Sequence, residues 1–189
     1  MNRIIAVVGM CGSGKSAACD VLKYLGWKYI RFGQLTIDRL LAEGQTITPE
    51  NEKLMREALR EEYGMGAFAW LSLPVIDEAL SELSVVIDGL YSWSEYKILK
   101  NRYPDNLEVV HIYASPRVRY QRLSMRRGGE NDKDRRMRVL SIKQAQKRDH
   151  AEIENIEKGG PIAMADFTVI NEGTVEELKK RMRAIVDSL

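Results

Sequence analysis

The chain has 189 residues, of which 44% are hydrophobic and 30% charged, as in an ordinary globular protein with one sizeable core. Its longest apolar runs, such as residues 85–87, are too short to cross a bilayer. Because the N-terminus also lacks a signal-peptide pattern, we expect a cytoplasmic protein. The net charge of +2 conceals a basic segment, since residues 117–148 hold 12 Lys/Arg and 3 Asp/Glu and leave 17 basic and 24 acidic residues elsewhere. This imbalance favours a polyanionic ligand at that segment.

The first half of the chain alternates short apolar runs with helical patterns. Strands rich in Ile and Val, typical of a buried parallel sheet, are predicted at residues 3–8, 27–32 and 84–87. Helices are predicted at residues 17–25, 34–42, 49–63 and 67–83. Thr48 before Pro49 is a good N-cap for the third helix, and Pro74 predicts a kink in the fourth.

The second half continues the alternation. Strands are predicted at residues 107–113 and 167–170, and helices at 93–102, 116–127 and 174–186, with a polar helix pair filling 132–157 and a loop at 159–161. Thr174 with Glu177 fits a capping box at the start of the last helix. Strands that alternate with helices predict a five-stranded parallel sheet with helices on both faces. Ligands of such folds bind at the carboxyl ends of the strands.

A glycine-rich motif follows the first strand and opens the first helix. It has the pattern G-x-x-x-x-G-K-S of a P-loop, whose backbone N–H groups cradle phosphate oxygens. Lys15 would reach the β- and γ-phosphates of ATP or GTP, and Ser16 would ligate Mg²⁺. The positive end of the helix points at the same anion. The predicted nucleotide-binding residues are Gly9, Cys11, Gly12, Ser13, Gly14, Lys15, Ser16 and Ala17.

An acid stands at the end of the third predicted strand. Asp88 would lie beside the P-loop, where it could organise Mg²⁺ or hold a substrate hydroxyl and act as a base. An Asp-Gly pair is also a common turn after a strand, which is the alternative explanation.

Arginines recur on the helix that follows the fourth strand. The spacing of Arg119, Arg122 and Arg126 puts them on one helix face, with Arg127 beside them. Arginine suits a phosphoryl transition state, so we predict that Arg122 and Arg126 act at the phosphates. A solvated charged face is the alternative. Farther on, residues 147–149 (Lys-Arg-Asp), with the flexible glycines 128–129, favour a closing lid over a solvated helix pair.

With these residues in place, the chain resembles the nucleoside monophosphate kinase superfamily over nearly its whole length. The nearest likeness is a family of small nucleotide kinases related to dephospho-coenzyme A kinase and best known from archaea. The resemblance rests on the P-loop and on residues 63–67, 86–89, 114–116, 122–127, 147–149 and 169–174. It implies a three-layer P-loop NTPase fold forming one domain over residues 1–189, with an acceptor-binding helical insert at about 33–83 and a lid at about 117–150. It also implies that Arg122 lies over the donor base.

The acceptor side departs from the superfamily pattern. Gln34 and Ile37 stand where relatives carry an acid and an arginine for the acceptor phosphate, and Arg39 falls on a different helix face. Tyr91 stands close to where another arginine is common. Arg60 matches the close family, so we predict an acceptor site formed by Arg60, Arg39, Tyr91 and Arg148.

The leading hypothesis is a kinase that uses ATP and Mg²⁺ on a small nucleotide-like acceptor. Lys15, Arg122 and Arg126 supply positive charge, and Asp88 orients the acceptor or the metal. A P-loop ATPase or switch is less well supported, because no N-K-x-D guanine signature follows. The basic segment has Tyr120 as its one aromatic residue, which argues against nucleic-acid stacking. The sequence leaves open the acceptor, the choice between ATP and GTP, and the oligomeric state. The tryptophans, Trp27, Trp70 and Trp93, are expected to pack in the core, as are Cys11 and Cys19.

Overall fold

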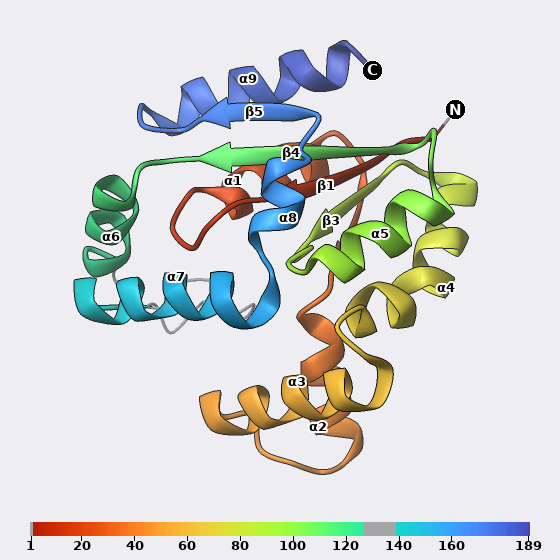
Figure 1. The fold of residues 1–189 in the computed structure, drawn as a ribbon. Coiled ribbons are helices and arrows are strands. Elements are labelled where there is room, and N and C mark those ends of the chain that lie inside the picture. Colours follow the sequence, from red (N-terminus) through yellow and green to blue (C-terminus); the bar gives the residue numbers. More distant parts are fainter. Residues whose placement is uncertain (1, 127–138) are drawn as a thin grey trace.

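The structure, a computed structural model, describes residues 2–126 and 139–189. Its centre is a parallel five-stranded sheet with the strand order β2-β3-β1-β4-β5 (Figure 1). The strands are β1 (Ile4–Val8), β2 (Lys28–Arg31), β3 (Val85–Asp88), β4 (Leu107–Tyr113) and β5 (Phe167–Ile170). The predicted five-stranded parallel sheet is therefore confirmed. Because β1 lies in the middle, the loop that follows it has a strand end on each side.

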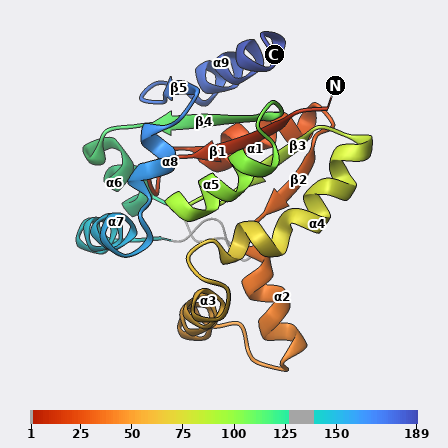
Figure 2. The ribbon, with the colours of Figure 1, turned by 45° about the vertical axis from the view of Figure 1, so that its right-hand side comes forward.

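Helices cover both faces of the sheet. The first half contributes α1 (Lys15–Tyr24), α2 (Gln34–Ala42), α3 (Pro49–Tyr63), α4 (Ala67–Glu82) and α5 (Trp93–Arg102). The second half contributes α6 (Pro116–Ser124), α7 (Ile142–Ile156), α8 (Gly159–Ala163) and α9 (Val175–Asp187). Figures 1 and 2 show α2 and α3 together on the side of the molecule away from α9, and α6 beside α7 near the end of β4.

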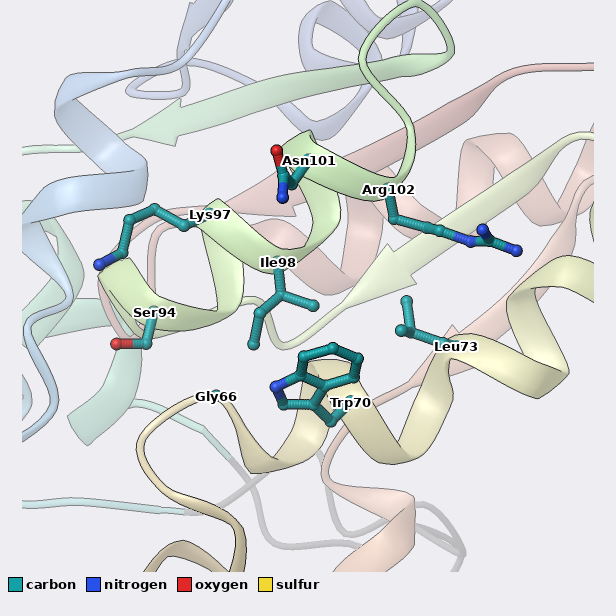
Figure 3. Close-up of a pocket in the computed structure, with 8 residues that line it drawn as sticks. All are labelled: Gly66, Trp70, Leu73, Ser94, Lys97, Ile98, Asn101 and Arg102. Atoms are coloured by element: carbon teal, nitrogen blue, oxygen red, sulfur yellow. The ribbon is translucent and has the colours of Figure 1, made fainter.

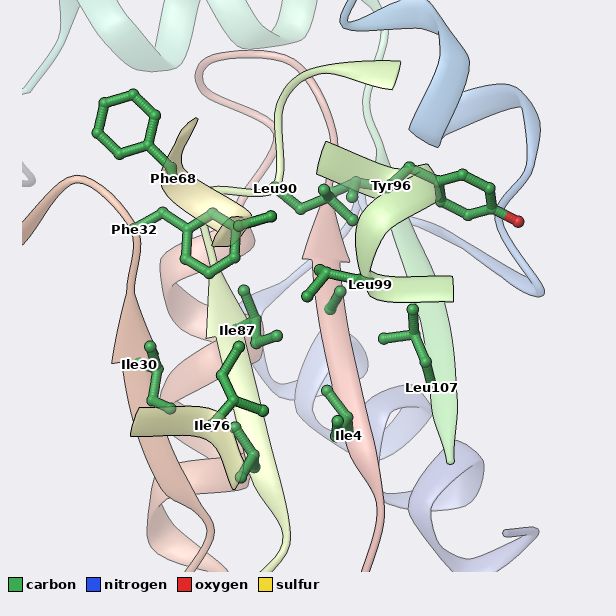
Figure 4. Close-up of a cluster of buried hydrophobic side chains, with 14 of the residues drawn as sticks. Ile4, Ile30, Phe32, Phe68, Ile76, Ile87, Leu90, Tyr96, Leu99 and Leu107 are labelled. Atoms are coloured by element: carbon green, nitrogen blue, oxygen red, sulfur yellow. The ribbon is translucent and has the colours of Figure 1, made fainter. Parts of the chain in front are cut away.

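Alternate residues of β1 belong to two separate cores, as the period of a strand requires. Ile4, Ala6 and Val8 pack with α4, α5 and the residues after β2, whereas Ile5 and Val7 pack with α1 and α9. Both faces are buried, which is why the strand reads as a continuous apolar run. The first core extends to the carboxyl ends of β2 and β3 through Phe32 and Leu90 (Figure 4). The segments that follow these strands are therefore packed against buried side chains.

Several boundaries differ from those expected. The helix after the P-loop begins at Lys15, two residues early, and α6 ends at Ser124 rather than at residue 127. Residues 159–161, expected to form a loop, begin the short helix α8, whose Pro161 is buried. Of the polar helix pair expected at 132–157, the structure describes α7, and the part within 127–138 lies outside the described residues. The capping box of Thr174 and Glu177 is present at α9.

Candidate nucleotide and acceptor site

The P-loop is held in its shape by left-handed glycines and by a distant asparagine. Gly9 has a φ of 140°, and Gly14, at the start of α1, has a φ of 106°. Asn171, just after β5, donates a hydrogen bond of 2.7 Å from Nδ2 to the carbonyl oxygen of Ser13. A Cβ on Gly14 would collide with that amide. The glycine is therefore required both by its backbone conformation and by the close approach of Asn171.

The loop has the features of a phosphate cradle. Lys15 folds back to donate from Nζ to the carbonyl oxygens of Gly9 and Met10, at 2.8 and 3.1 Å. Ser13 Oγ is buried with no hydrogen-bond partner among the described residues. Ser16 lies in the first turn of α1, where backbone N–H groups lack acceptors within the helix. These donors suit an anion at the loop, which would also draw Lys15 off its own carbonyl oxygens.

Asp88 ends β3 at the level of the strand residue that precedes the P-loop. The parallel register pairs Asp88 with Val7, two residues before Gly9. The hydroxyl of Tyr29 on β2 donates to Asp88 Oδ2 at 2.8 Å, and Asp88 is buried. The carboxylate is thus fixed from one side at the edge of the sheet where the loop begins.

The arginines of α6 do not form a simple solvated face. Arg119 is 4% exposed and donates to the carbonyl oxygens of Ala114 and Cys11, both at 3.0 Å. Arg122 donates from Nη1 to the carbonyl oxygen of Asn171 at 2.8 Å. Arg126 is half-buried at the end of the described part of this segment. Arg119 and Arg122 therefore support the P-loop, one directly and the other through the residue that binds Ser13.

A buried ion pair joins α6 to α7. Arg119 Nη2 lies 2.6 Å from Asp149 Oδ2, and both side chains are about 5% exposed. The same oxygen accepts a hydrogen bond of 2.9 Å from the hydroxyl of Tyr120. Since Arg119 also holds the carbonyl of Cys11, this pair connects α7 to the P-loop. Asp149, the acid of residues 147–149, therefore joins α7 to α6.

Arg148, which was predicted to bind the acceptor, has a partner other than Asp149. Its Nε donates to Glu152 Oε1 at 2.8 Å, one turn along α7. The other carboxylate oxygen of Glu152 accepts from Lys158 Nζ, which is buried. Burial opposes ionisation, but Lys158 and Arg148 hold the pKa of Glu152 at about 2. Glu152 could have been found from the i,i+4 spacing, whereas Lys158 gave no signal because it precedes two glycines and looks like a loop residue.

The acceptor residues fall into two groups. Arg60 lies over the ring of Phe68 at 5.2 Å, and burial lowers its pKa against the attraction of Glu95. Tyr91 follows β3, and burial, followed by the charges of Asp88 and Glu152, raises its pKa. Arg39 instead pairs with Glu43 at 2.8 Å on the exposed face of α2. Arg60 and Arg148 therefore both interact electrostatically with Tyr91, whereas Arg39 pairs elsewhere.

Glu95 is a residue that sequence reasoning missed. It completes a capping box with Ser92 at the start of α5, and its Oε2 accepts from the backbone N–H groups of Tyr91 and Ser92 at 2.8 and 2.9 Å. Its Oε1 and the Nε of Arg60 are buried without a hydrogen-bond partner among the described residues. Burial raises the pKa of Glu95 to about 7 despite these hydrogen bonds. Two unsatisfied polar atoms beside Tyr91 are what an acceptor pocket would leave in the free protein.

A groove with a volume of about 540 Å³ lies elsewhere, between α4 and α5. Figure 3 shows Trp70 and Ile98 facing each other across it. Trp70 is 57% exposed, contrary to the expectation that it packs in the core, whereas Trp93 packs against the core and stacks on Tyr96. Cys19 is buried as expected, and Cys11 is half-buried. None of the groove residues belongs to the P-loop.

Two properties of residues 2–126 and 139–189 bear on membrane and metal binding. No helix in this part of the chain is long and apolar enough to cross a membrane. It also contains no group of three or more His, Cys, Asp or Glu side chains able to hold a metal ion.

Comparison with known proteins adds the family. Residues 5–153 match the AAA domain family. A UPF0200 protein of Sulfurisphaera tokodaii is 33% identical over 186 residues, covering 97% of this chain and 96% of its own length. A UPF0200 protein of Thermococcus gammatolerans is 30% identical over 188 residues, covering 98% and 95%.

Solved structures share the fold. A shikimate kinase from Bacteroides thetaiotaomicron has a TM-score of 0.60 at 15% identity and covers 98% of both chains. A sugar kinase from Janibacter has a TM-score of 0.59 at 17% identity, covering 99% of this chain and 95% of its own. These likenesses establish a P-loop kinase-like fold. The sequence matches show that the chain belongs to the AAA domain family and to the UPF0200 proteins.

Proposed function

We propose that the protein is a phosphotransferase that moves the γ-phosphate of ATP to a small nucleotide or nucleotide-like acceptor. The observation that carries this proposal is the position of Asp88, paired in register with Val7 beside the P-loop, with Tyr91, Arg60 and Arg148 beyond it. The loop accounts for nucleotide binding. The second group of charged side chains is what an acceptor would need.

The transfer depends on positioning and charge neutralisation more than on covalent help. Lys15 would donate to the β- and γ-phosphates, and Arg122 and Arg126 would hold the donor. A bound Mg²⁺, held by Ser16 and Asp88, would neutralise charge on the same phosphates. An oxygen of the acceptor forms a bond to the γ-phosphorus in line with the bond to the β–γ bridging oxygen, which breaks to release ADP. If the acceptor oxygen is a hydroxyl, its proton passes to Asp88.

The acceptor is proposed to be anionic. Arg60 and Arg148 both interact electrostatically with Tyr91, and the exposed Arg39 does not complete the usual monophosphate site. AMP, CMP and UMP are therefore expected to be poor acceptors. The names of the structural neighbours widen the choice of candidates, since they include kinases of shikimate, sugars and gluconate.

The test is a panel of nucleosides, nucleotides, dephospho-coenzyme A, shikimate and gluconate, each scored for ADP release that depends on the acceptor. At least one anionic acceptor should raise ADP release well above the rate with ATP alone, and mass spectrometry should find it one phosphate heavier. Equal ADP release with and without every acceptor would instead support the second candidate, an ATPase or switch. The observation that favours an ATPase or switch is that Gln34 and Ile37 replace the usual acceptor residues.

A further inference from the structure

Lys158 is a buried lysine that the proposed reaction does not use directly. It is 2% exposed and stands between α7 and α8, at the N-cap of α8. Its Nζ lies 2.5 Å from Glu152 Oε2 and 4.5 Å from the centre of the Tyr91 ring. A lysine is rarely buried this completely unless its charge is paired.

Glu152 passes the effect of Lys158 on to Arg148. Its two carboxylate oxygens are divided between the two cations, Oε2 to Lys158 and Oε1 to Arg148 Nε at 2.8 Å. Arg148 is about a third exposed, and its electrostatic neighbours include Tyr91 and Cys11 of the P-loop. Because Nε is taken by Glu152, the outer nitrogens of the guanidinium are left for a ligand.

We infer that Lys158 is a positioning residue for the phosphate bound at the P-loop, because it fixes Arg148 through Glu152 and Tyr91 through its ring. This inference rests on the proposed function for the identity of the ligand, a phosphate at the P-loop. The contacts of Lys158 with Glu152 and Tyr91 do not depend on that function. With Lys158 in place, both oxygens of the Glu152 carboxylate are bound, and Arg148 is held where Cys11 and Tyr91 are among its electrostatic neighbours. Without it, Glu152 can rotate with Arg148 toward solvent. Glu152 would then remain paired while the guanidinium lost its fixed place.

The charges around Lys158 give the arrangement a pH dependence. Burial, followed by the repulsion of Lys15 and to a smaller extent that of Arg148, lowers the pKa of Lys158 to about 8 against the attraction of Glu152. Tyr91 contributes its ring face. Below this pKa the ammonium is charged and the chain of contacts is complete, and above it the link to Glu152 weakens. The position of Arg148 should therefore loosen as the pH rises through 8.

The experiment compares the whole protein with Lys158→Met, Lys158→Arg and a matched control, Lys100→Met. Lys100 donates to the carbonyl oxygen of Leu107 at the amino end of β4, away from the carboxyl ends of the strands where the P-loop begins. The first measurement is the NMR signal of the Arg148 Nε–H without ligand, assigned by its loss in Arg148→Lys. The second is the ratio of the dissociation constants of Mg-ADP and Mg-AMP-PNP, an ATP analogue that is not cleaved.

We expect Lys158→Met to shift the NMR signal of the Arg148 Nε–H and to speed the exchange of this proton with water. The ratio of the dissociation constant of Mg-ADP to that of Mg-AMP-PNP should fall about tenfold, toward its value in Arg148→Lys. Lys158→Arg should restore both, and Lys100→Met should change neither. An unchanged signal and ratio in Lys158→Met, even with a lower melting temperature, would overturn the inference and leave Lys158 as a structural residue.

If Lys158→Met does not fold, the wild type answers the question. Its Arg148 signal should change between pH 7 and pH 9.5, and in Lys158→Arg it should stay constant. A constant signal in the wild type would overturn the inference. Neither measurement uses an acceptor, so a panel without any phosphorylated product would refute the proposed kinase and leave the role of Lys158 standing.

Discussion

In the proposed function, Lys15 is the side chain on which phosphate binding depends most directly. In the free protein it is held by the carbonyl oxygens of its own loop, so its removal leaves the packing of β1 and α1 unchanged. Lys15→Ala should lower phosphoryl transfer by on the order of 10²-fold or more, because the developing charge loses its closest cation. The measurement is ADP release with the acceptor that the panel identifies, with circular dichroism to confirm the fold.

Lys179→Ala is the matched control for Lys15. Lys179 lies on α9 and pairs with Glu176 on the surface, so its loss should leave turnover unchanged. Turnover close to wild type in Lys15→Ala would remove this residue from the mechanism.

Arg60 belongs to the acceptor in the proposed function. Its Nε is buried without a partner in the part of the chain that the structure describes, and Glu95 lies nearby. Arg60→Ala should raise the Michaelis constant of the acceptor or lower turnover by about tenfold or more, the effect of losing a hydrogen bond to a charged group. The affinity for ATP should hardly change.

Arg56→Ala controls for the loss of a positive charge from α3, since Arg56 pairs with Glu52 one turn earlier. If Arg60→Ala has the kinetics of this control, Arg60 is a structural residue that packs on Phe68, and the acceptor is held elsewhere.

At the scale of elements, α6 and α7 are the described parts of the predicted lid. They are joined by the Arg119–Asp149 pair, and Arg119 also touches the P-loop, so the two helices should respond together to a ligand. We expect amides of 117–126 and 142–148 to gain hydrogen-exchange protection when ATP and acceptor bind together. Residues 183–187 at the end of α9, which lie near the amino end of β1, serve as the internal control and should not change (Figure 1).

Protection that appears at the P-loop alone would contradict the lid assignment. In that case α6 and α7 would be a fixed support of the loop, a role that the buried ion pair would also serve.

At the scale of the whole molecule, Glu95 makes stability depend on pH. Burial, as its largest cause, raises the pKa of Glu95 from 4.5 to about 7. Between these two values the folded protein binds more protons than the unfolded one, so this contribution to stability is present below pH 4.5 and is lost as the pH rises through 7. A glutamine side chain at this position would stay neutral and could still accept from the N–H groups of Tyr91 and Ser92. Glu95→Gln should therefore raise the free energy of unfolding at pH 8 by up to about 3 kcal/mol, with little effect at pH 4.5.

Denaturant unfolding at both pH values measures this difference. Glu61→Gln, at an exposed position of α3, controls for the loss of a negative charge. Lower stability of Glu95→Gln at pH 8 would mean that the hydrogen bonds of the charged carboxylate outweigh the cost of burying it.

The fold follows from local patterns that do not need distant partners. The apolar run of β1 and the P-loop after it specify a buried strand and a helix start, and the capping box of Thr174 specifies the start of α9. The helix α8 was missed because Gly159 and Gly160 favour a loop, and only the burial of Pro161 against the rest of the protein stabilises a helical turn there.

The sequence by itself determined the shape of the P-loop, the predicted phosphate site. The spacing of Gly9, Gly14, Lys15 and Ser16 sets this shape because the loop joins two adjacent elements, β1 and α1. The tertiary structure alone decided what surrounds it. Asn171 reaches Ser13 from a distant part of the chain, and Arg119, expected on an arginine face, is buried against Asp149. Such contacts join segments far apart in the chain, and they depend on how helices pack rather than on any periodicity within one segment.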